Sequence, residues 1–327
     1  MTPQISVTGG LRYSYDRKHN EFQDFWSNGT APSTLVFDWA TSFPTVANLR
    51  FENFGNWSGK AEVEYKPDNN TLIYVSVNRG TKSGGFGTIS SPGFAGYTID
   101  PAVAAVAGGP PLVQAIPFGQ EVLINYEGGF KLTLFNRTTH LNGSAFFYNY
   151  DGYQAFQNVG TNQYITNHKA YNKGVELEFN TRPVKGLYLS AFLTFLDSKV
   201  KGITLPAGVI ADRQLPQAPQ ASAGWLARYE FAAGPGMLAL QTDWKYESGQ
   251  YFETINAPVD YEPGHTVGNV RISYKFGHGK YELAAFANNV TDKWYRVYNL
   301  DLSGLLGSSN QTYARPRWMG GSLTVNF

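Results

Sequence analysis

The stretch from Tyr313 to Phe327, YARPRWMGGSLTVNF, constrains the fold of this chain more than any other segment. Its second half alternates between apolar or small residues and polar residues up to the last position, a pattern that predicts a β-strand with one apolar face. Chain termini usually fray into water, so a terminal Phe327 suits a strand whose apolar face contacts lipid. An ordinary terminal strand of a soluble sheet is the alternative interpretation.

The same alternation recurs along the whole chain. Between Ile5 and Tyr15 the odd positions are apolar, aromatic or glycine and the even positions are polar, and Trp57 to Tyr65 shows the same division. About twelve strands are predicted, an even number, from this period of two. The other expected strands are Thr71–Arg79, Val122–Leu134, Leu141–Tyr150, Gly174–Thr181, Leu187–Leu196, Ala221–Glu230, Leu238–Glu247, Gly268–Phe276, Tyr281–Val290 and the final stretch.

The predicted connections have two different lengths. Short turns begin at Pro67, Asn136, Pro183, Ala233 and Gly277. Long connections are expected at 17–56, 80–121, 151–173, 197–220, 248–267 and 291–312, and the two kinds alternate without exception. Membrane barrels combine tight periplasmic turns with long extracellular loops, whereas soluble sandwiches and propellers do not need every second link to be long. We therefore expect an all-β fold, an antiparallel transmembrane β-barrel or partial barrel, with both chain ends on the periplasmic side.

Composition excludes several other classes. The formal net charge of +1 gives no electrostatic reason to expect nucleic acid as a partner, and the absence of cysteine removes thiol chemistry and disulfides. No apolar run is long enough for a membrane-spanning helix. The first residues lack the basic and apolar regions of a signal peptide, so we expect either a cut mature start or a fragment.

The predicted strands carry their charges on one face, which we expect to line the lumen. A Lys or Arg that faces lipid at the bilayer midplane costs about 2–4 kcal/mol, which explains this bias. We expect four apolar residues to point outward: Leu189, Leu193, Leu240 and Ile272. We expect four charged residues to point inward: Glu176, Glu178, Asp243 and Arg271.

Five segments in this order resemble TonB-dependent outer-membrane receptors: VSVNRGTKSGGFG from Val75, YEGGFK from Tyr126, NKGVELEF from Asn172, NNVTDKWY from Asn288, and the terminal stretch. The resemblance implies a bacterial outer-membrane protein whose barrel encloses an N-terminal plug and imports a large nutrient, most often a ferric siderophore. It also implies that Gly321, Leu323, Val325 and Phe327 form the signal that the barrel-assembly machinery reads.

The sequence departs from the family pattern because it has no plug, no TonB box and too few strands. By this resemblance, residues 1–327 are one barrel segment, the C-terminal part of a larger barrel. The TonB complex would then act through the missing plug, outer-membrane lipids and lipopolysaccharide would surround the barrel, and the chain by itself would not import actively. The first and last strands would be left with open hydrogen-bonding edges, so the fragment would have to close on itself, bind other chains or aggregate.

No catalytic, cofactor or metal site is predicted. The five histidines are isolated and lack ligand spacing, and GTKSGGFG follows an alternating strand rather than opening a helix as a phosphate loop does. A passive pore and, less favoured, a barrel enzyme remain the alternatives to a receptor. Aromatic and cationic loop residues suit large, flat or anionic cargo. The candidate substrate contacts are Lys82, Phe86, Phe94, Tyr97, Tyr251, Phe252, Trp294, Arg296 and Tyr298.

Overall fold

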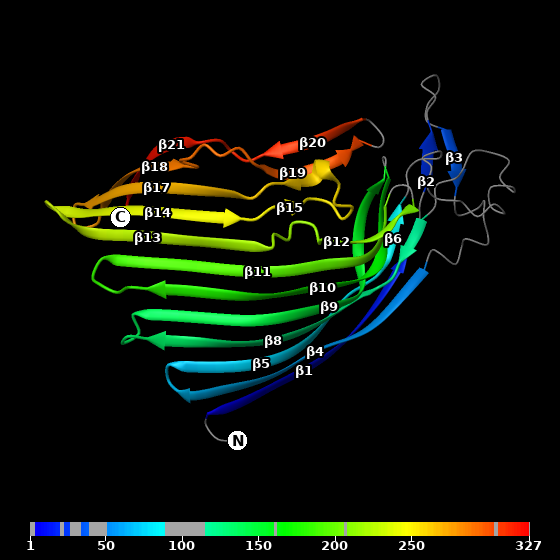
Figure 1. Ribbon diagram of the computed structural model, residues 1–327, viewed down its shortest axis with the longest axis horizontal. Coiled ribbons are helices and arrows are strands. Elements are labelled where there is room, and N and C mark those ends of the chain that lie inside the picture. The colour runs from blue at the N-terminus through cyan, green and yellow to red at the C-terminus, as the bar shows by residue number, and fades with distance from the viewer. Residues whose placement is uncertain are drawn as a thin grey trace.

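The computed structural model describes residues 4–19, 23–26, 34–38, 51–88, 115–159, 162–205, 208–303 and 307–326. It is dominated by one antiparallel sheet, and the order of the strands across this sheet is their order in the chain (Figure 1). Its strands in order are β1 (Ile5–His19), β4 (Phe51–Asp68), β5 (Thr71–Lys82), β8 (Glu121–Leu134), β9 (Thr139–Val159), β10 (Asn162–Thr181), β11 (Leu187–Thr204), β13 (Ala221–Ala233), β14 (Gly236–Glu247), β17 (His265–Phe276), β18 (Tyr281–Asn288) and β21 (Trp318–Val325), and β12 (Ile210–Arg213) pairs with the end of β11.

The sheet is open in the described part of the chain, because β1 and β21 stand at the two ends of the strand order and do not pair with each other. The start of β1 and the end of β21 lie at the end of the sheet that carries the short turns (Figure 1). The antiparallel membrane-barrel prediction is therefore confirmed in strand order and direction.

Short additional elements lie at the opposite end, which we call the loop end (Figure 1). They are the hairpins β2–β3 (Gln23–Trp26 and Thr34–Asp38), β6–β7 (Gly85–Thr88 and Ala115–Phe118), β15–β16 (Gln250–Tyr251 and Tyr261–Glu262) and β19–β20 (Arg296–Leu302 and Ser308–Tyr313), and the 3₁₀ turn η3 (Pro258–Asp260). No helix in the described ranges is long and apolar enough to cross a membrane.

The predicted alternation of short and long links is wrong at one place. The segment 151–173 was expected to be a long connection, but β9 continues to Val159 and β10 begins at Asn162, so the two strands form one long hairpin. The extension is stable because it packs on β11 and the segment after β12, where Ala155, Ala170, Val200, Ile203 and Leu215 form a buried apolar cluster. Several other strands also exceed the predicted length, and β11 has 18 residues.

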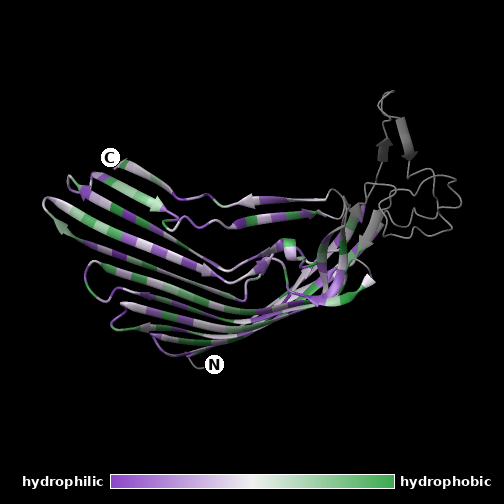
Figure 2. Ribbon diagram, turned by 45° about the horizontal axis from the view of Figure 1, so that its top comes forward, coloured by the Kyte–Doolittle hydropathy of each residue, from purple (hydrophilic) through white to green (hydrophobic). Residues whose placement is uncertain are grey.

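The register confirms the predicted division of the two faces. Residues directly opposite in an antiparallel pair share a face, and Leu240 pairs with Ile272 while Gln241 pairs with Arg271. Leu240 and Ile272 are 44% and 45% exposed, as expected for side chains that need lipid to cover them. The other residues predicted to point outward form the pairs Leu193 with Leu177 and Leu189 with Ala227. Those predicted to point inward form the pairs Glu176 with Thr194, Glu178 with Phe192, and Asp243 with Asn269. Figure 2 shows the resulting alternation of hydrophobic and hydrophilic residues along the strands.

Candidate functional site

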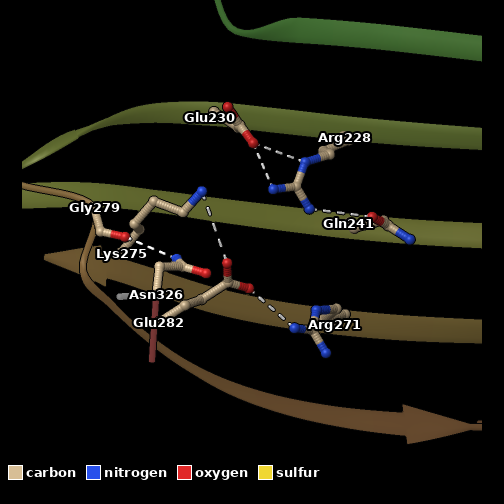
Figure 3. Close-up of polar contacts among 8 residues, drawn as sticks. All are labelled: Arg228, Glu230, Gln241, Arg271, Lys275, Gly279, Glu282 and Asn326. Atoms are coloured by element: carbon tan, nitrogen blue, oxygen red, sulfur yellow. Dashed lines mark hydrogen bonds and ion pairs between the residues drawn. The ribbon is translucent and has the colours of Figure 1, made fainter. Parts of the chain in front are cut away.

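The inner face of the sheet carries two separate groups of charged and amide side chains, each held together by hydrogen bonds and ion pairs (Figure 3). On β13, Arg228 binds Glu230 through two guanidinium nitrogens and donates from Nη1 to Oε1 of Gln241 at 3.2 Å. On β18, Glu282 accepts from Nη2 of Arg271 at 3.0 Å and lies 3.9 Å from Nζ of Lys275, and both of these cations are on β17. These pairs keep opposite charges together on a polar surface, which is what a water-filled or protein-filled lumen requires.

A second polar centre lies at the loop end, where Arg296 at the start of β19 joins two loops. Its Nε donates to Oε2 of Glu262 at 2.8 Å, its Nη1 to the carbonyl oxygen of Val259 at 2.8 Å, and its Nη2 to that of Tyr261. The side chains of Arg296 and Glu262 are only 13% and 7% exposed. The guanidinium also lies 5.9 Å from the ring centre of Phe252. We call this group the Arg296 clasp, because it fastens β19 to β16 and η3.

Next to the clasp, Asp260 is buried with an exposed fraction of 1%. Asn299 donates from Nδ2 to Oδ1 of Asp260, and Ser309 donates to Oδ1 of Asn299 at 2.6 Å. The other carboxylate oxygen, Oδ2, has no hydrogen-bond partner among the described residues. Burial raises the pKa of Asp260 to about 6, against the lowering effect of the Asn299 hydrogen bond.

The extended β9–β10 hairpin connects to the loops on both of its sides. Gln154 donates from Nε2 to the carbonyl oxygens of Ser83 at 2.9 Å and Gly119 at 3.2 Å. Thr254, in the loop between β15 and η3, donates to the carbonyl oxygen of Phe156 at 2.8 Å. The hairpin therefore supports the β6–β7 hairpin and the Arg296 clasp region from one scaffold.

The candidate substrate contacts fall into two groups in the structure. Tyr251, Phe252, Trp294, Arg296 and Tyr298 lie in or beside the clasp region, whereas Lys82 and Phe86 lie at the end of β5 and in β6. Phe94 and Tyr97 are outside the described residues, as is Phe327.

Exposure differs strongly within the first group. Trp294 and Tyr298 are 67% and 45% exposed, so both rings are accessible. Phe252 is only 6% exposed, and all three guanidinium nitrogens of Arg296 bind protein atoms. Trp294 also packs on Tyr313 with ring centres 6.0 Å apart, which fixes its position. Phe252 and Arg296 therefore stabilise the clasp region from within. Trp294 and Tyr298 remain exposed on its surface.

Several residues whose hydrogen bonds hold the loops in place had not been identified from the sequence: Gln154, Thr254, Asp260, Glu262 and Asn299. Their partners lie far away in the chain, 34 residues from Glu262 to Arg296 and 98 from Thr254 to Phe156, so no local spacing marks them. In the described ranges, no group of three or more His, Cys, Asp or Glu residues is placed to hold a metal ion.

The terminal strand β21 pairs with β18 along its whole length. Leu323 lies opposite Leu283 and Gly321 opposite Ala285, so the predicted apolar positions share the outer face. Leu323 is 63% exposed and Leu283 is 49% exposed. This geometry is consistent with the expected assembly signal, which stays a prediction.

A membrane-spanning antiparallel sheet with short turns at one end, large loops at the other and a charged inner face defines an outer-membrane barrel protein. The family model described as "TonB dependent receptor-like, beta-barrel" matches residues 1–290, so this chain belongs to the TonB-dependent receptor family. Members of this family reside in the bacterial outer membrane and are transporters rather than enzymes.

Solved receptor structures share this fold. The ferric yersiniabactin uptake receptor FyuA from Yersinia pestis matches with a TM-score of 0.74 at 18% identity, over 100% of this chain and 44% of the receptor. The siderophore receptor PiuA from Acinetobacter baumannii matches with 0.64 at 18% identity, over 98% and 40%. The copper transporter OprC matches with 0.67 at 14% identity, over 100% and 46%. The chain thus spans less than half the length of these three structures.

Proposed function

We propose that residues 1–327 form the C-terminal part of the barrel of an outer-membrane receptor that imports a large nutrient with energy supplied through TonB. The family membership and the match to less than half of each receptor structure support this assignment. A ferric siderophore is the first candidate for the cargo, because FyuA and PiuA, two of the receptors that share the fold, are described as taking up or binding such chelates.

The observation that carries the substrate assignment is the pair of exposed aromatic rings on the Arg296 clasp. Trp294 and Tyr298 are accessible, and the clasp beneath them is fixed by buried ionic and hydrogen bonds. Rigid aromatic side chains bind flat ligands with little loss of conformational entropy. Lys82, which is exposed, adds a positive charge at the end of β5 that suits an anionic chelate.

Within the predicted set we therefore assign direct contact to Lys82, Phe86, Tyr251, Trp294 and Tyr298, with Phe94 and Tyr97 retained from the sequence. Phe252 and Arg296 act by positioning the loops. Removing a stacking aromatic typically weakens ligand binding by about 1–3 kcal/mol, which corresponds to a loss of roughly five- to 150-fold in affinity.

The test is uptake of radiolabelled ferric siderophores by cells that produce the full-length receptor. Trp294→Ala and Tyr298→Ala should each reduce uptake of the cognate chelate, whereas Phe135→Ala should not, because Phe135 is 76% exposed in the short turn between β8 and β9. Uptake should also stop in cells that lack TonB. Uptake that is unsaturable and independent of TonB would instead identify a passive pore, and uptake of copper alone would exclude a siderophore.

A further inference from the structure

The connection from β18 to β19 contains a buried asparagine a short distance before the exposed ring of Trp294. Asn289 is 4% exposed, whereas Trp294 is 67% exposed. The backbone of Asn289 has a φ of 50°, in the left-handed region, which asparagine adopts more readily than most other residues. A polar side chain that is buried this deeply must be hydrogen-bonded, so its partners show what it does.

The side chain of Asn289 binds the residue that directly precedes Trp294. Its Oδ1 accepts the backbone N–H of Lys293 at 2.8 Å, and its Nδ2 donates to the carbonyl oxygen of Lys293 at 2.9 Å. The same Nδ2 donates to the carbonyl oxygen of Arg315, between β20 and β21, at 3.4 Å. A backbone N–H can only donate and a carbonyl oxygen can only accept, so these partners fix the orientation of the amide.

Asn289 is itself attached to the inner face of the sheet. Its backbone N–H donates to Oδ1 of Asn269 at 3.0 Å, and Nδ2 of Asn269 donates to Oδ2 of Asp243 at 2.6 Å. Asp243 and Asn269 lie directly opposite each other on β14 and β17. A continuous series of hydrogen bonds therefore runs from the sheet to Lys293. We call Asp243, Asn269, Asn289 and Lys293 the Asn289 chain.

The residue that follows Trp294 is also bound to the protein. The ring of Tyr295 stacks on the buried His265 with ring centres 4.2 Å apart. The carbonyl oxygen of Tyr295 accepts the backbone N–H of Ala314 at 3.0 Å. Both chain neighbours of Trp294 are thus held, while its own ring stays accessible. A ring on a fixed backbone loses less conformational freedom when a ligand stacks on it.

The Asn289 chain and the Arg296 clasp act on opposite sides of Trp294 in the sequence. The Asn289 chain holds Lys293, directly before Trp294, and the clasp holds Arg296, at the start of β19. Tyr298 lies beyond Arg296 on β19, so the clasp separates it from the Asn289 chain. A change at Asn289 should therefore affect Trp294 more than Tyr298.

We propose that Asn289 is a positioning residue for cargo binding, which holds the ring of Trp294 in place through its two hydrogen bonds to Lys293. The inference rests on the proposed function, in which Trp294 contacts the cargo. Asn289 is buried and acts only through Lys293. Its removal should therefore weaken only the part of the affinity that Trp294 supplies.

The test uses the full-length receptor in detergent and the variant Asn289→Gly. Glycine keeps the left-handed backbone conformation and removes only the side-chain hydrogen bonds. The matched control is Asn136→Gly, at an exposed asparagine with a φ of 53° in the short turn between β8 and β9. The first measurement is hydrogen exchange of the Lys293 amide, which donates to Asn289. We expect exchange about tenfold faster in Asn289→Gly and unchanged in the control.

The second measurement is a double-mutant cycle on the affinity for two probes, a ferric tris-catecholate and a ferric tris-hydroxamate. We expect Asn289→Gly to weaken binding about fivefold by itself, and less than about twofold when Trp294 is already alanine. The same cycle with Lys82→Gln, at the end of β5, should be additive. If Asn289→Gly does not insert, Asn289→Asp replaces it, because it keeps the acceptor for the Lys293 N–H and loses both donations.

Three results would overturn the proposal: equal losses of affinity with and without Trp294, unchanged affinity in Asn289→Gly, or equal Lys293 exchange in wild type and Asn289→Gly. If Trp294→Ala leaves the binding of both probes unchanged, the contact assigned to Trp294 is wrong, and this proposal is overturned with it. If neither probe binds the wild type, the proposed cargo class is wrong. The exchange of the Lys293 amide then decides the positioning role by itself.

Discussion

Arg296 and Glu262 form a buried ion pair, 2.8 Å between Nε and Oε2, that joins β19 to the loop between β14 and β17. Both side chains are almost fully enclosed, and the remaining guanidinium nitrogens bind carbonyl oxygens of the same loop. The pair thus determines where the exposed rings of Trp294 and Tyr298 are held. Its energetics can be tested directly.

Arg296→Ala should release the clasp. Removing one partner leaves Glu262 buried and uncompensated, which costs about 3–5 kcal/mol in comparable pairs. The expected result is faster hydrogen exchange and proteolysis in 250–262 without loss of the barrel. Lys60→Ala, which breaks an exposed pair with Glu62 on the inner face, should change stability by less than about 1 kcal/mol. Equal protection of the loop in wild type and Arg296→Ala would contradict the assignment.

Asp260 should make the clasp region sensitive to pH. Its folded-state pKa is raised from 3.8 to about 6 by burial, so the folded form prefers the protonated carboxyl. The resulting stabilisation is fully present below the unfolded-state pKa and is lost as pH rises through the folded-state pKa. Hydrogen exchange of 257–262, corrected for intrinsic rates, should therefore be slower near pH 4 than near pH 7. Asp260→Asn should remove this dependence, and a persistent dependence in that variant would assign it to another group.

Adjacent positions on β14 should tolerate the same new charge to different degrees. Leu240→Lys places an ammonium group on the lipid face and should cost about 2–4 kcal/mol if the position is near the midplane. Gln241→Lys places it on the polar inner face, beside Arg228 and Arg271, and should cost less. Comparing the temperature at which each folded barrel loses its resistance to detergent measures the difference. Equal losses would contradict the assignment of the two faces.

Gly174 should tolerate no side chain, because β10 and β11 approach closely there. A Cβ at this position would lie 2.3 Å from the carbonyl oxygen of Phe195 and 2.9 Å from the ring of Phe146. Gly174→Ala should therefore destabilise the barrel by about 1–3 kcal/mol. At Gly80, on β5, a Cβ would meet no atom within 4 Å, so Gly80→Ala is the control and should be close to neutral. Thermal unfolding of the two variants in detergent checks this.

The terminal strand should matter more for assembly than for the finished fold. Deleting Phe327, or replacing Leu323 by Ser, should lower the amount of receptor in the outer membrane. The protein that does insert should keep nearly normal thermal stability, because Leu323 is 63% exposed on the outer face and is not part of a core. Ser322→Ala, on the opposite face of β21, is the control and should assemble normally. Normal insertion rates without Phe327 would count against the signal.

The sequence by itself determined which segments form the sheet strands, which side chains lie on each face of the sheet, and the protein family. Side-chain alternation is a local property with a period of two, so Leu240 and Gln241 could be assigned to opposite faces without any tertiary information. The turn residues and the terminal stretch are likewise contiguous in the chain. For this reason the strand order from β1 to β21 agreed with the expectation.

Only the tertiary structure decided how the loop end is built. The β9–β10 extension depends on Ala155 and Ala170 packing against Val200 and Ile203, and the sequence alone had indicated a loop there. Arg296 looked like a cation available for substrate, and the structure shows that each of its guanidinium nitrogens already donates to a protein oxygen, on Glu262, Val259 or Tyr261. Such contacts join residues tens of positions apart through burial and geometry, which no local pattern encodes.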